Sequence, residues 1–581
     1  MTIPAEAPRD PWSPRPIDRP TPVATDAALD SAKIFAAPDD PAEWPRWRED
    51  LVAWRERART GYSGALYDEP AFAWTQSCFS VALVWLWDER LYDHEAQRFT
   101  PERLLAEAAE EFGGYDAVVL WHAYPVIGID ERNQFDWYRD VPGIRELVAA
   151  FQQHDVRVFV DYNPWDVGTR REPVGDAAAV AELVHELGAD GVFLDTMKEA
   201  MPELRAALPD AAFEGESTLP LARIADHHLS WAQWFADSDV PGVIRARWFE
   251  QRHMLHHTRR WNRSHADELR SAWLNGVGVL VWENVFGSWV GWNERDRGLL
   301  RGIVEVQRRW SRLLTHGEWT PLAARSDDLQ VVGSSWRLGD EELWALANRL
   351  DEPFAGEVRL GGRSVPFSLP PLGLAAVTPA GVTVFGGGSA EYPARATVRL
   401  AVPEARVAAV PDGFVAVEPA PSRARFRRRE TGVYGEVPYV EEWKPLPPRL
   451  HDFVEVERPA PRGPFAIAIR EEPVTGLSLA EARAYASARS ARLPTEDEWQ
   501  LAAAAGLLER NEPLVWNWTE SEHSDGRTRF AILKGGSAFR AEGSEWYVDG
   551  GPQPPEFSLQ LLLAGPLQRS PQIGFRLAVD L

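Results

Sequence analysis

A chain of 581 residues is too long for one ordinary domain, and we expect about two to four. Its formal net charge of −25 argues against a nucleic-acid partner and an anionic membrane surface, and no stretch is long and apolar enough to span a bilayer. The single Cys78 excludes an internal disulfide, and the N-terminus lacks the apolar core of a secretion signal, so we expect a cytoplasmic protein.

The N-terminal 60 residues divide into two parts. Residues 1–40 are rich in Pro, Ala and Asp and lack periodicity, which predicts a mostly disordered lead-in. In residues 41–60, Trp44, Trp47, Leu51 and Trp54 recur at helical spacing, which predicts an amphipathic helix.

From about residue 78, strand-like and helical segments alternate. Strands are predicted at 80–87, 116–122, 156–162, 191–195, 211–214 and 278–282, and helices at 101–112, 142–154, 177–188 and 202–208. Repeated strand–helix units with continuously apolar strands predict an α/β fold whose parallel sheet is buried on both faces. The repeat length favours a (β/α)8 TIM barrel over residues 41–315, with the sixth and seventh strands expected between residues 244 and 257.

The pattern changes after the barrel. Short alternating runs between residues 328 and 380 predict a small β-sandwich at 316–385. A Gly-Gly-Gly-Ser segment at 386–389 opens a linker that we place at 386–404. The remainder, 405–581, is predicted to be a separate domain of irregular pattern.

Residues at the C-terminal ends of barrel strands face the substrate in this fold. Here those positions carry carboxylates and aromatic side chains: Trp121 and His122; Asp161, Asn163 and Trp165; Asp195; Glu214 and Glu216; and Trp282 and Glu283. Glycoside hydrolysis needs one carboxyl to attack or stabilise the anomeric carbon and another to protonate the leaving oxygen. Polar acceptors for sugar hydroxyls and an aromatic platform complete such a site, so we expect a carbohydrate substrate.

The barrel, over about residues 75–315, resembles the α-amylase-like and α-galactosidase-like glycoside hydrolases. These families carry the nucleophile as an Asp that ends the fourth strand in a D-G-x-x-x-D pattern, which residues 190–195 match. The resemblance therefore implies Asp195 as the nucleophile. Both branches carry a basic residue two positions before it, and this chain has Phe193 there, which leaves the sugar, anomer and linkage open.

More than one residue remains a candidate for the acid/base. In the amylase-like branch it is a Glu that ends the fifth strand, which implies Glu216 or Glu214; we prefer Glu216 because Gly215 lets the chain turn into the cleft. In the galactosidase-like branch the acid would be Asp237 or Asp239.

A cluster of histidines does not suggest a metal site. His253, His256 and His257 lie at helical spacing but lack the Glu and third ligand of a motif such as H-E-x-x-H. We therefore expect no metal and no cofactor.

Four short motifs follow one another in the last domain: A-R-L-P-T-E-D-E-W at 491–499, V-W-N-W-T at 515–519, L-K-G-G-S at 533–537 and G-F-R-L at 574–577. In this order they resemble the formylglycine-generating, or sulfatase-modifying factor, family, whose fold is a variant of the C-type lectin fold. Active members bind copper through a cysteine pair near the end of the domain, and residues 405–581 contain no cysteine. The resemblance thus implies a non-oxidase relative that binds a glycan or partner, or caps the barrel.

Together these features predict a retaining glycoside hydrolase that acts on an oligosaccharide or glycoside. The alternatives left open are a non-catalytic carbohydrate-binding or scaffold protein and a formylglycine-generating enzyme, which the missing cysteines disfavour. We also expect the C-terminal domain to pack on the barrel and help shape its rim. The sequence does not give the oligomeric state.

Overall fold

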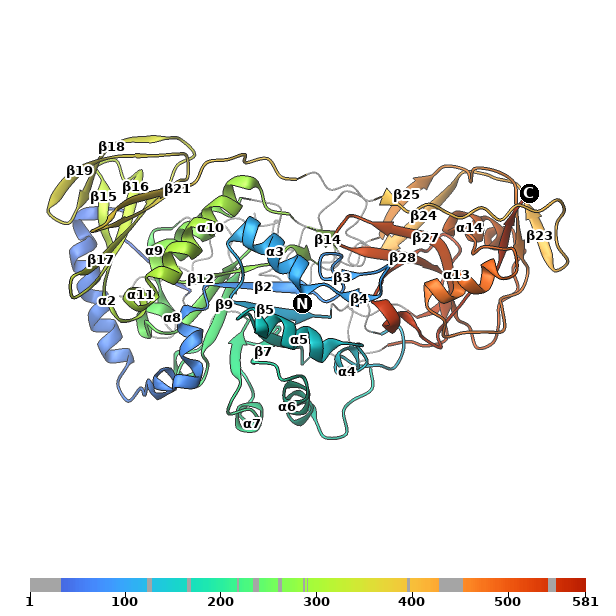
Figure 1. Ribbon diagram of the computed structural model, residues 1–581, viewed down its shortest axis with the longest axis horizontal. Helices are drawn as coiled ribbons and strands as arrows, with labels where there is room; N and C mark the ends of the chain where they lie inside the picture. Colours follow the sequence, from blue (N-terminus) through green and yellow to red (C-terminus); the bar gives the residue numbers. More distant parts are fainter. Residues whose placement is uncertain are drawn as a thin grey trace, which may run out of the picture.

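The computed structural model describes residues 33–122, 128–164, 169–216, 219–233, 240–259, 264–285, 288–289, 291–393, 398–427, 453–541 and 550–581. Along its long axis lie a seven-stranded β-domain, a central barrel and a C-terminal domain with many short strands (Figure 1). In the part of the chain described, no helix is long and apolar enough to cross a membrane.

The central unit is a closed barrel of eight parallel strands in the order β11-β12-β2-β5-β6-β7-β8-β9, which confirms the predicted TIM-barrel architecture. Helices cover its outside and side chains fill its inside, so the strands are almost continuously buried. The strands are β2 (Ser80–Trp85), β5 (Ala117–Trp121), β6 (Arg157–Tyr162), β7 (Gly191–Leu194), β8 (Ala212–Gly215), β9 (Leu229–Gln233), β11 (Met254–Thr258) and β12 (Gly278–Val281).

Around the barrel lie α3 (Pro101–Phe112), α4 (Asp136–Arg139), α5 (Ile144–Gln153), α6 (Asp176–Leu187), α7 (Pro202–Ala207), α8 (Arg245–Phe249), α9 (Ala266–Asn275), α10 (Glu294–Arg309) and α11 (Ser311–His316). Short elements at the strand ends are the hairpins β3 (Tyr92–Asp93) with β4 (Arg98–Phe99) and β13 (Asn284–Val285) with β14 (Ser288–Trp289), and the 3-10 turn η6 (Leu221–Arg223).

The sixth and seventh strands test the weakest part of the sequence prediction. The seventh, β11, lies almost wholly in the expected interval. The sixth, β9, lies before residue 244, so its expected position is wrong. Its five residues, Leu-Ser-Trp-Ala-Gln, mix polar and apolar side chains and carry no clear period.

The described chain before the barrel forms a strand and a helix. Strand β1 (Ile34–Ala36) pairs with β10 (Gly242–Ile244), and α2 (Trp44–Ala58) buries Trp44, Trp47, Leu51 and Trp54, as the helical spacing predicts. The 3-10 turns η2 (Pro41–Glu43), η3 (Ala65–Asp68) and η4 (Pro70–Ser77) connect this segment to the barrel. Residues 34–40 therefore pack with the barrel rather than form part of a lead-in.

The β-domain follows α11 and contains β15 (Glu318–Ser326), β16 (Val331–Leu338), β17 (Glu341–Asn348), β18 (Phe354–Leu360), β19 (Arg363–Leu369), β20 (Leu374–Thr378) and β21 (Gly381–Phe385). These strands share one antiparallel sheet, and the register of β15 against β16 shifts between Thr320 and Ala324, beyond which β15 also pairs with β18. Val358 on β18 and Leu369 on β19 belong to the same hydrophobic cluster as Val331 on β16 and Leu346 on β17. The two halves of the sheet thus share one core, as in the predicted sandwich, although their strands form one continuous sheet.

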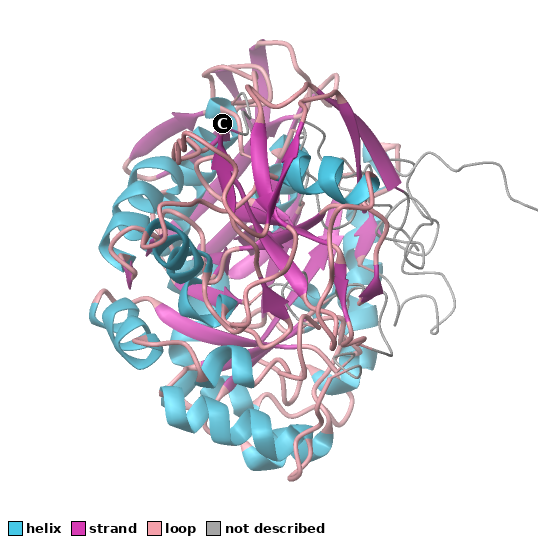
Figure 2. Ribbon diagram, turned by 90° about the vertical axis from the view of Figure 1, so that its right-hand side faces the viewer, coloured by secondary structure: helices cyan, strands magenta, loops and turns pink. Residues whose placement is uncertain are grey.

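In its described part, the C-terminal domain combines two helices with several small sheets (Figure 2). Its elements are β22 (Val398–Arg399), β23 (Phe414–Val417), β24 (Ser422–Arg427), β25 (Phe453–Arg458), β26 (Phe465–Ala468), α13 (Leu479–Ser487), α14 (Glu496–Ala504), β27 (Trp516–Ser524), β28 (Arg529–Lys534), β29 (Gly536–Ser537), β30 (Gly551–Pro552), β31 (Leu559–Leu562), η9 (Gly565–Gln568), β32 (Ile573–Gly574) and β33 (Ala578–Asp580). The R-L-P-T-E-D-E-W motif opens α14 with a capping box between Thr495 and Glu498, which satisfies backbone donors at the start of the helix. In the K-G-G-S motif, Gly536 has φ +83°, and a Cβ there would collide with the carbonyl oxygen of Gly551.

The C-terminal domain packs against the end of the barrel at which the parallel strands finish, which confirms the expected contact. The backbone N–H of Glu89, just after β2, donates to the carbonyl of Arg527 at 2.9 Å. The guanidinium of Arg132, in the segment after β5, donates to the carbonyl of Leu567 at 3.0 Å. In Figure 1 the hairpin β3–β4 and the strand β14 face β27 and β28 across this junction.

Candidate active site

The strand register fixes which side chains share a layer inside the barrel. Phe193 on β7 pairs with Asp161 on β6 and with Glu214 on β8. Because side chains alternate along a strand, Asp195 and Glu216 lie on the same inward face, one layer nearer the rim. The barrel therefore brings Asp195 and Glu216 to the ends of adjacent strands.

A backbone contact ties these two acids together. The N–H of Thr196 donates a short hydrogen bond to the carboxylate of Glu216, and Thr196 has a left-handed φ of 61°, which is uncommon for a β-branched residue. Standard bond lengths then keep the carboxylates of Asp195 and Glu216 within about 9 Å of each other. A Cβ at Gly215 would lie 2.3 Å from the carbonyl oxygen of Lys198, so the glycine lets the segment after Asp195 pack against β8.

Asp195 is held from the neighbouring strand. The side-chain amide of Asn163 donates to its Oδ2 at 3.3 Å. Gln134 clamps Asn163 from both sides: its Oε1 accepts from the Asn163 N–H at 3.0 Å and its Nε2 donates to the Asn163 carbonyl at 2.6 Å. Sequence reasoning missed Gln134, because it lies in a connection that carries no motif.

Asp161 is a buried acid whose two carboxylate oxygens have no hydrogen-bond partner among the described residues. Burial, and then the negative charge of Glu216, raise the pKa of Asp161 well above its usual range. The Nε2 of His122 lies 3.7 Å from Asp161 Oδ2, but burial lowers the pKa of His122 to about 3, so the imidazole is neutral near pH 7. The Asp161 N–H donates to the hydroxyl of Tyr138 at 2.9 Å.

The barrel strands and their ends carry a cluster of buried rings that we call the aromatic floor: Trp121, Phe193, Trp231 and Trp282. The ring centroid of Trp282 is 5.7 Å from that of Trp121 and 5.9 Å from that of Trp231, and Trp231 is 4.9 Å from Phe193. The indole N–H of Trp231 and the hydroxyl of Thr258 are buried without a partner in the described part of the structure. Sequence reasoning missed Trp231 together with its strand.

Glu214 does not join the rim. It is fully buried, and its Oε1 lies 2.6 Å from Nδ1 of His256, whose Nε2 contacts the carbonyl of Cys78 before β2. Burial lowers the pKa of His256, but the carboxylate of Glu214 outweighs it, and the net pKa is raised. This pair therefore lies deeper in the barrel, toward the starts of the strands.

The other two histidines are also internal. His253 contacts the hydroxyls of Tyr67 and Ser230 at 2.8 Å each, and His257 contacts Ser271 at 3.1 Å. Among the described residues no group of three or more His, Cys, Asp or Glu side chains is arranged to hold a metal ion.

Glu283, predicted to bind substrate, is paired with a cation. Arg90 donates to its Oε2 at 2.8 Å and also to Asp88, and all three side chains are buried. Trp165, Asp237 and Asp239 lie outside the described residues.

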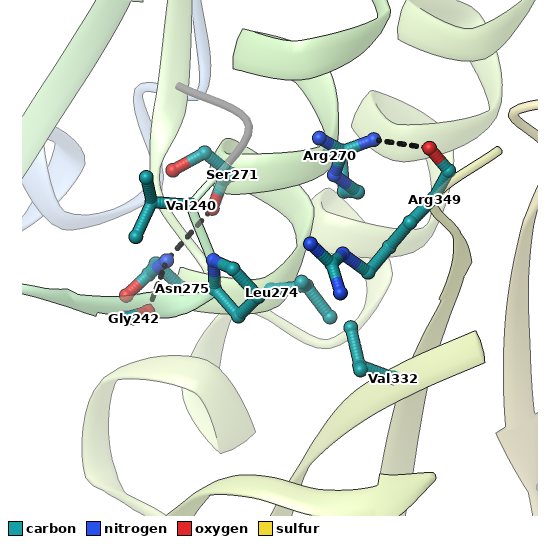
Figure 3. A pocket seen from close by; sticks show the side chains of 9 residues that line it. Val240, Gly242, Arg270, Ser271, Leu274, Asn275, Val332 and Arg349 are labelled. Carbon is teal, nitrogen blue, oxygen red and sulfur yellow. Dashed lines mark hydrogen bonds between the residues drawn. The ribbon is translucent and has the colours of Figure 1, made fainter. Parts of the chain in front are cut away.

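A separate small hollow lies between the barrel and the β-domain. It is lined by Val240, Pro241, Gly242, Arg270, Ser271, Leu274, Asn275, Val332 and Arg349 (Figure 3). In Figure 3 the guanidinium of Arg270 donates to the carbonyl of Arg349, and Asn275 bonds to Gly242 and Ser271. These contacts join α9 to its neighbours, and none of the residues predicted for catalysis lines the hollow.

Two of the comparisons with known proteins concern sequence alone. Residues 451–514 match the model of the sulfatase-modifying factor enzyme 1-like domain, in agreement with the resemblance of the C-terminal motifs. No curated protein matches the chain significantly.

Solved structures similar to this chain include three that share 11–12% sequence identity with it. The debranching enzyme of Nostoc punctiforme is 11% identical, covers 54% of this chain and 99% of its own, and gives a TM-score of 0.37. The maltogenic α-amylase AmyB of Thermotoga neapolitana is 11% identical, with 54% and 99% covered and a TM-score of 0.35. The cyclic α-maltosyl-(1→6)-maltose hydrolase of Arthrobacter globiformis is 12% identical, with 52% and 98% covered and a TM-score of 0.35.

Proposed function

We propose that the barrel is a retaining glycoside hydrolase that acts on an oligosaccharide or glycoside. Asp195 is the nucleophile, and Glu216 is the acid/base that first protonates the leaving oxygen and then activates water. Glu214 is not the acid/base in this proposal, because His256 engages it a layer deeper.

The observation that carries the proposal is the bond from the Thr196 N–H to Glu216, directly after Asp195. It keeps two partly exposed carboxyl groups within about 9 Å of each other, at the end of the barrel where this fold carries its chemistry. A pair of carboxyl groups about 5–5.5 Å apart suits the covalent, retaining route, and a pair about 6.5–9.5 Å apart suits direct attack by water.

The surroundings favour a polyhydroxylated ligand. Asp161 offers two buried oxygens without a hydrogen-bond partner in the described structure, and buried polar groups of this kind are normally satisfied by a ligand or by water. Because its pKa is raised, Asp161 can also donate a hydrogen bond to a sugar hydroxyl. His122 beside Asp161 and Asn163 beside Asp195 supply further polar atoms, and the aromatic floor provides the apolar surface.

The C-terminal domain takes no oxidative role in this proposal. Thiolate ligands are what copper(I) selects, and the chain's one cysteine, Cys78, is buried in the barrel, where burial raises the pKa of its thiol.

The test is hydrolysis by the purified full chain of a panel of p-nitrophenyl glycosides and of α- and β-linked oligosaccharides. Asp195→Asn, which is nearly isosteric, should lower kcat/KM by about 10³-fold or more on every substrate the parent cleaves, with an unchanged circular dichroism spectrum. Glu216→Gln should lose far more activity on oligosaccharides than on p-nitrophenyl glycosides, because p-nitrophenolate leaves without a proton.

Asp190→Asn is the matched control. Asp190 belongs to the same D-G-x-x-x-D pattern but lies at the other end of β7, where it bonds to Arg157 and Gln152. Its variant should keep the parent kcat/KM. Saccharide binding without hydrolysis by the parent would favour the non-catalytic alternative, and normal turnover by Asp195→Asn would remove Asp195 from the mechanism.

A further inference from the structure

The turn that joins β27 and β28 reaches from the C-terminal domain onto the rim of the barrel. Its main anchor is Glu89, which follows β2: Glu89 accepts a short hydrogen bond from the hydroxyl of Ser524 and bonds to Nε of Arg529 at 3.1 Å. The backbone bond from Glu89 to Arg527 completes this anchor. The turn is thus fixed to the barrel by both backbone and side-chain bonds.

A second contact joins the same turn to the end of the eighth strand. The side-chain amide of Asn284 donates to Oγ1 of Thr528 at 2.8 Å. Asn284 is 2% exposed and Thr528 is fully buried, so the bond is shielded from water. Breaking a buried hydrogen bond from one side leaves the other group unsatisfied, which costs more than the bond itself contributes.

Asn284 in turn holds the aromatic floor. Its carbonyl accepts a short hydrogen bond from the indole N–H of Trp282, the floor residue that contacts both Trp121 and Trp231. Between them, Glu283 is fixed by Arg90. A path of direct contacts therefore runs from Thr528, through Asn284, to the ring of Trp282.

We propose that Thr528 is a positioning residue: through Asn284 it sets the orientation of Trp282, so that the C-terminal domain fixes the surface against which the barrel binds a pyranose ring. This inference rests on the proposed function for the nature of the ligand. The coupling between Thr528 and the end of β12 stands on the contacts alone.

The experiment compares three variants of the full chain. Thr528→Val keeps the shape of the side chain but removes the acceptor, and Thr528→Ser restores it. Thr519→Val is the matched control, because Thr519 lies on the same hairpin and is equally buried, but its hydroxyl donates to the carbonyl of Ile532 within the domain. Hydrogen exchange of the peptide 278–285 measures the coupling between Thr528 and the end of β12. The effect of this coupling on binding is measured by KM and kcat, using the p-nitrophenyl glycoside that the parent cleaves most efficiently.

We expect Thr528→Val to speed exchange in 278–285 about tenfold and to raise KM about fivefold, with kcat changed less than twofold, because the substrate surface moves while the carboxyl pair stays in place. Thr528→Ser should return both values to those of the parent. Thr519→Val should leave both unchanged, even if it lowers the melting temperature.

Two results would overturn the inference. One is exchange in 278–285 that is the same in Thr528→Val and Thr519→Val. The other is faster exchange in Thr528→Val with a parent-like KM. If the parent hydrolyses no glycoside, the proposed function fails separately, and hydrogen exchange alone decides whether Thr528 holds the end of β12.

Discussion

Three carboxyl side chains at neighbouring strand ends have different surroundings. Asp161 is buried without a hydrogen-bond partner among the described residues, Asp195 accepts from Asn163, and Glu216 accepts from the backbone beside Asp195. Like charges this close do not all ionise equally, and the raised pKa of Asp161 reflects its burial first and the charge of Glu216 second. These environments suit the three roles we propose: Asp161 binds a sugar hydroxyl, Asp195 is the nucleophile and Glu216 is the acid/base.

Gln134 offers a test of this arrangement at the level of one residue. Gln134→Met removes both of its bonds to the backbone of Asn163 at similar side-chain length, so Asn163 should no longer hold Asp195 in place. We expect kcat to fall about tenfold, equivalent to about 1.4 kcal/mol, with a smaller change in KM.

The control for Gln134→Met is Gln152→Met. Gln152 makes a comparable pair of bonds, to Gly188 and Asp190, at the opposite end of β7. Steady-state kinetics on the same glycoside should show parent-like values for this variant. Equal losses of kcat in the two variants would mean that Gln134 contributes only to stability.

At the scale of single elements, β8 shows how one short strand serves two purposes. Glu214 and Glu216 both point inward, but Glu214 pairs with His256 in the core and Glu216 reaches the rim. Gly215 between them gives the chain room to pass the backbone of Lys198. The strand that carries the proposed acid/base is thus anchored by a buried ion pair one layer below.

This pair predicts a pH-dependent stability. The pKa of His256 is raised above its ordinary value near 6.5, so its contribution to stability is fully present below about pH 6.5 and is lost as the pH rises through the folded-state pKa. Glu214→Gln should therefore destabilise the protein most at about pH 6, by about 3 kcal/mol, and clearly less at about pH 9. Urea denaturation of parent and variant at both pH values measures the difference.

His257→Gln is the comparison variant for the urea denaturation of Glu214→Gln. His257 is equally buried on β11, but its pKa is lowered, first by burial and then by nearby positive charges, so it is neutral across this range. Below about pH 6.5 the unfolded chain protonates His257 and the folded chain does not, so the stability loss of His257→Gln should be smaller at about pH 6 than at about pH 9, the reverse of Glu214→Gln. A loss for Glu214→Gln that is the same at both pH values would mean that His256 is not charged in the folded protein.

At the scale of the whole molecule, the C-terminal domain is joined to the barrel by opposite charges and buried polar bonds. Arg529 bonds to Glu89 and Glu95, Arg527 lies 3.5 Å from Glu107, and Asn284 bonds to Thr528. Exposed ion pairs contribute little by themselves, so the buried contacts near β12 define the geometry. The domain is therefore placed where it can act on the site of the barrel.

The cysteine content of the whole chain predicts that this domain does not bind copper(I). With one cysteine, buried in the barrel, the protein has no thiolate pair for copper(I). The purified chain should hold far less than one equivalent of copper by elemental analysis, before and after incubation with copper(I). It should leave a sulfatase-motif cysteine peptide unchanged by mass spectrometry. Stoichiometric copper, or formylglycine in the peptide, would contradict this.

The sequence by itself determined what depends on local pattern. Alternating strand and helix periods predicted the barrel, six of its strands and four of the helices between them without any knowledge of contacts, since those periods reflect which faces are buried. The R-L-P-T-E-D-E-W motif opens α14 with a capping box, and such a box is local because it joins residues three apart. The same kind of information placed Asp195 and Glu216 at strand ends.

Only the tertiary structure decided what depends on residues far apart in the chain. The inward layers separated Glu214 from Glu216, β9 brought Trp231 against Phe193, and Gln134 met Asn163 across 29 positions. The bond from Asn284 to Thr528 spans 244 positions. No local period encodes such pairs, because they form when the barrel closes and the last domain docks on it, and burial of the whole core sets their geometry.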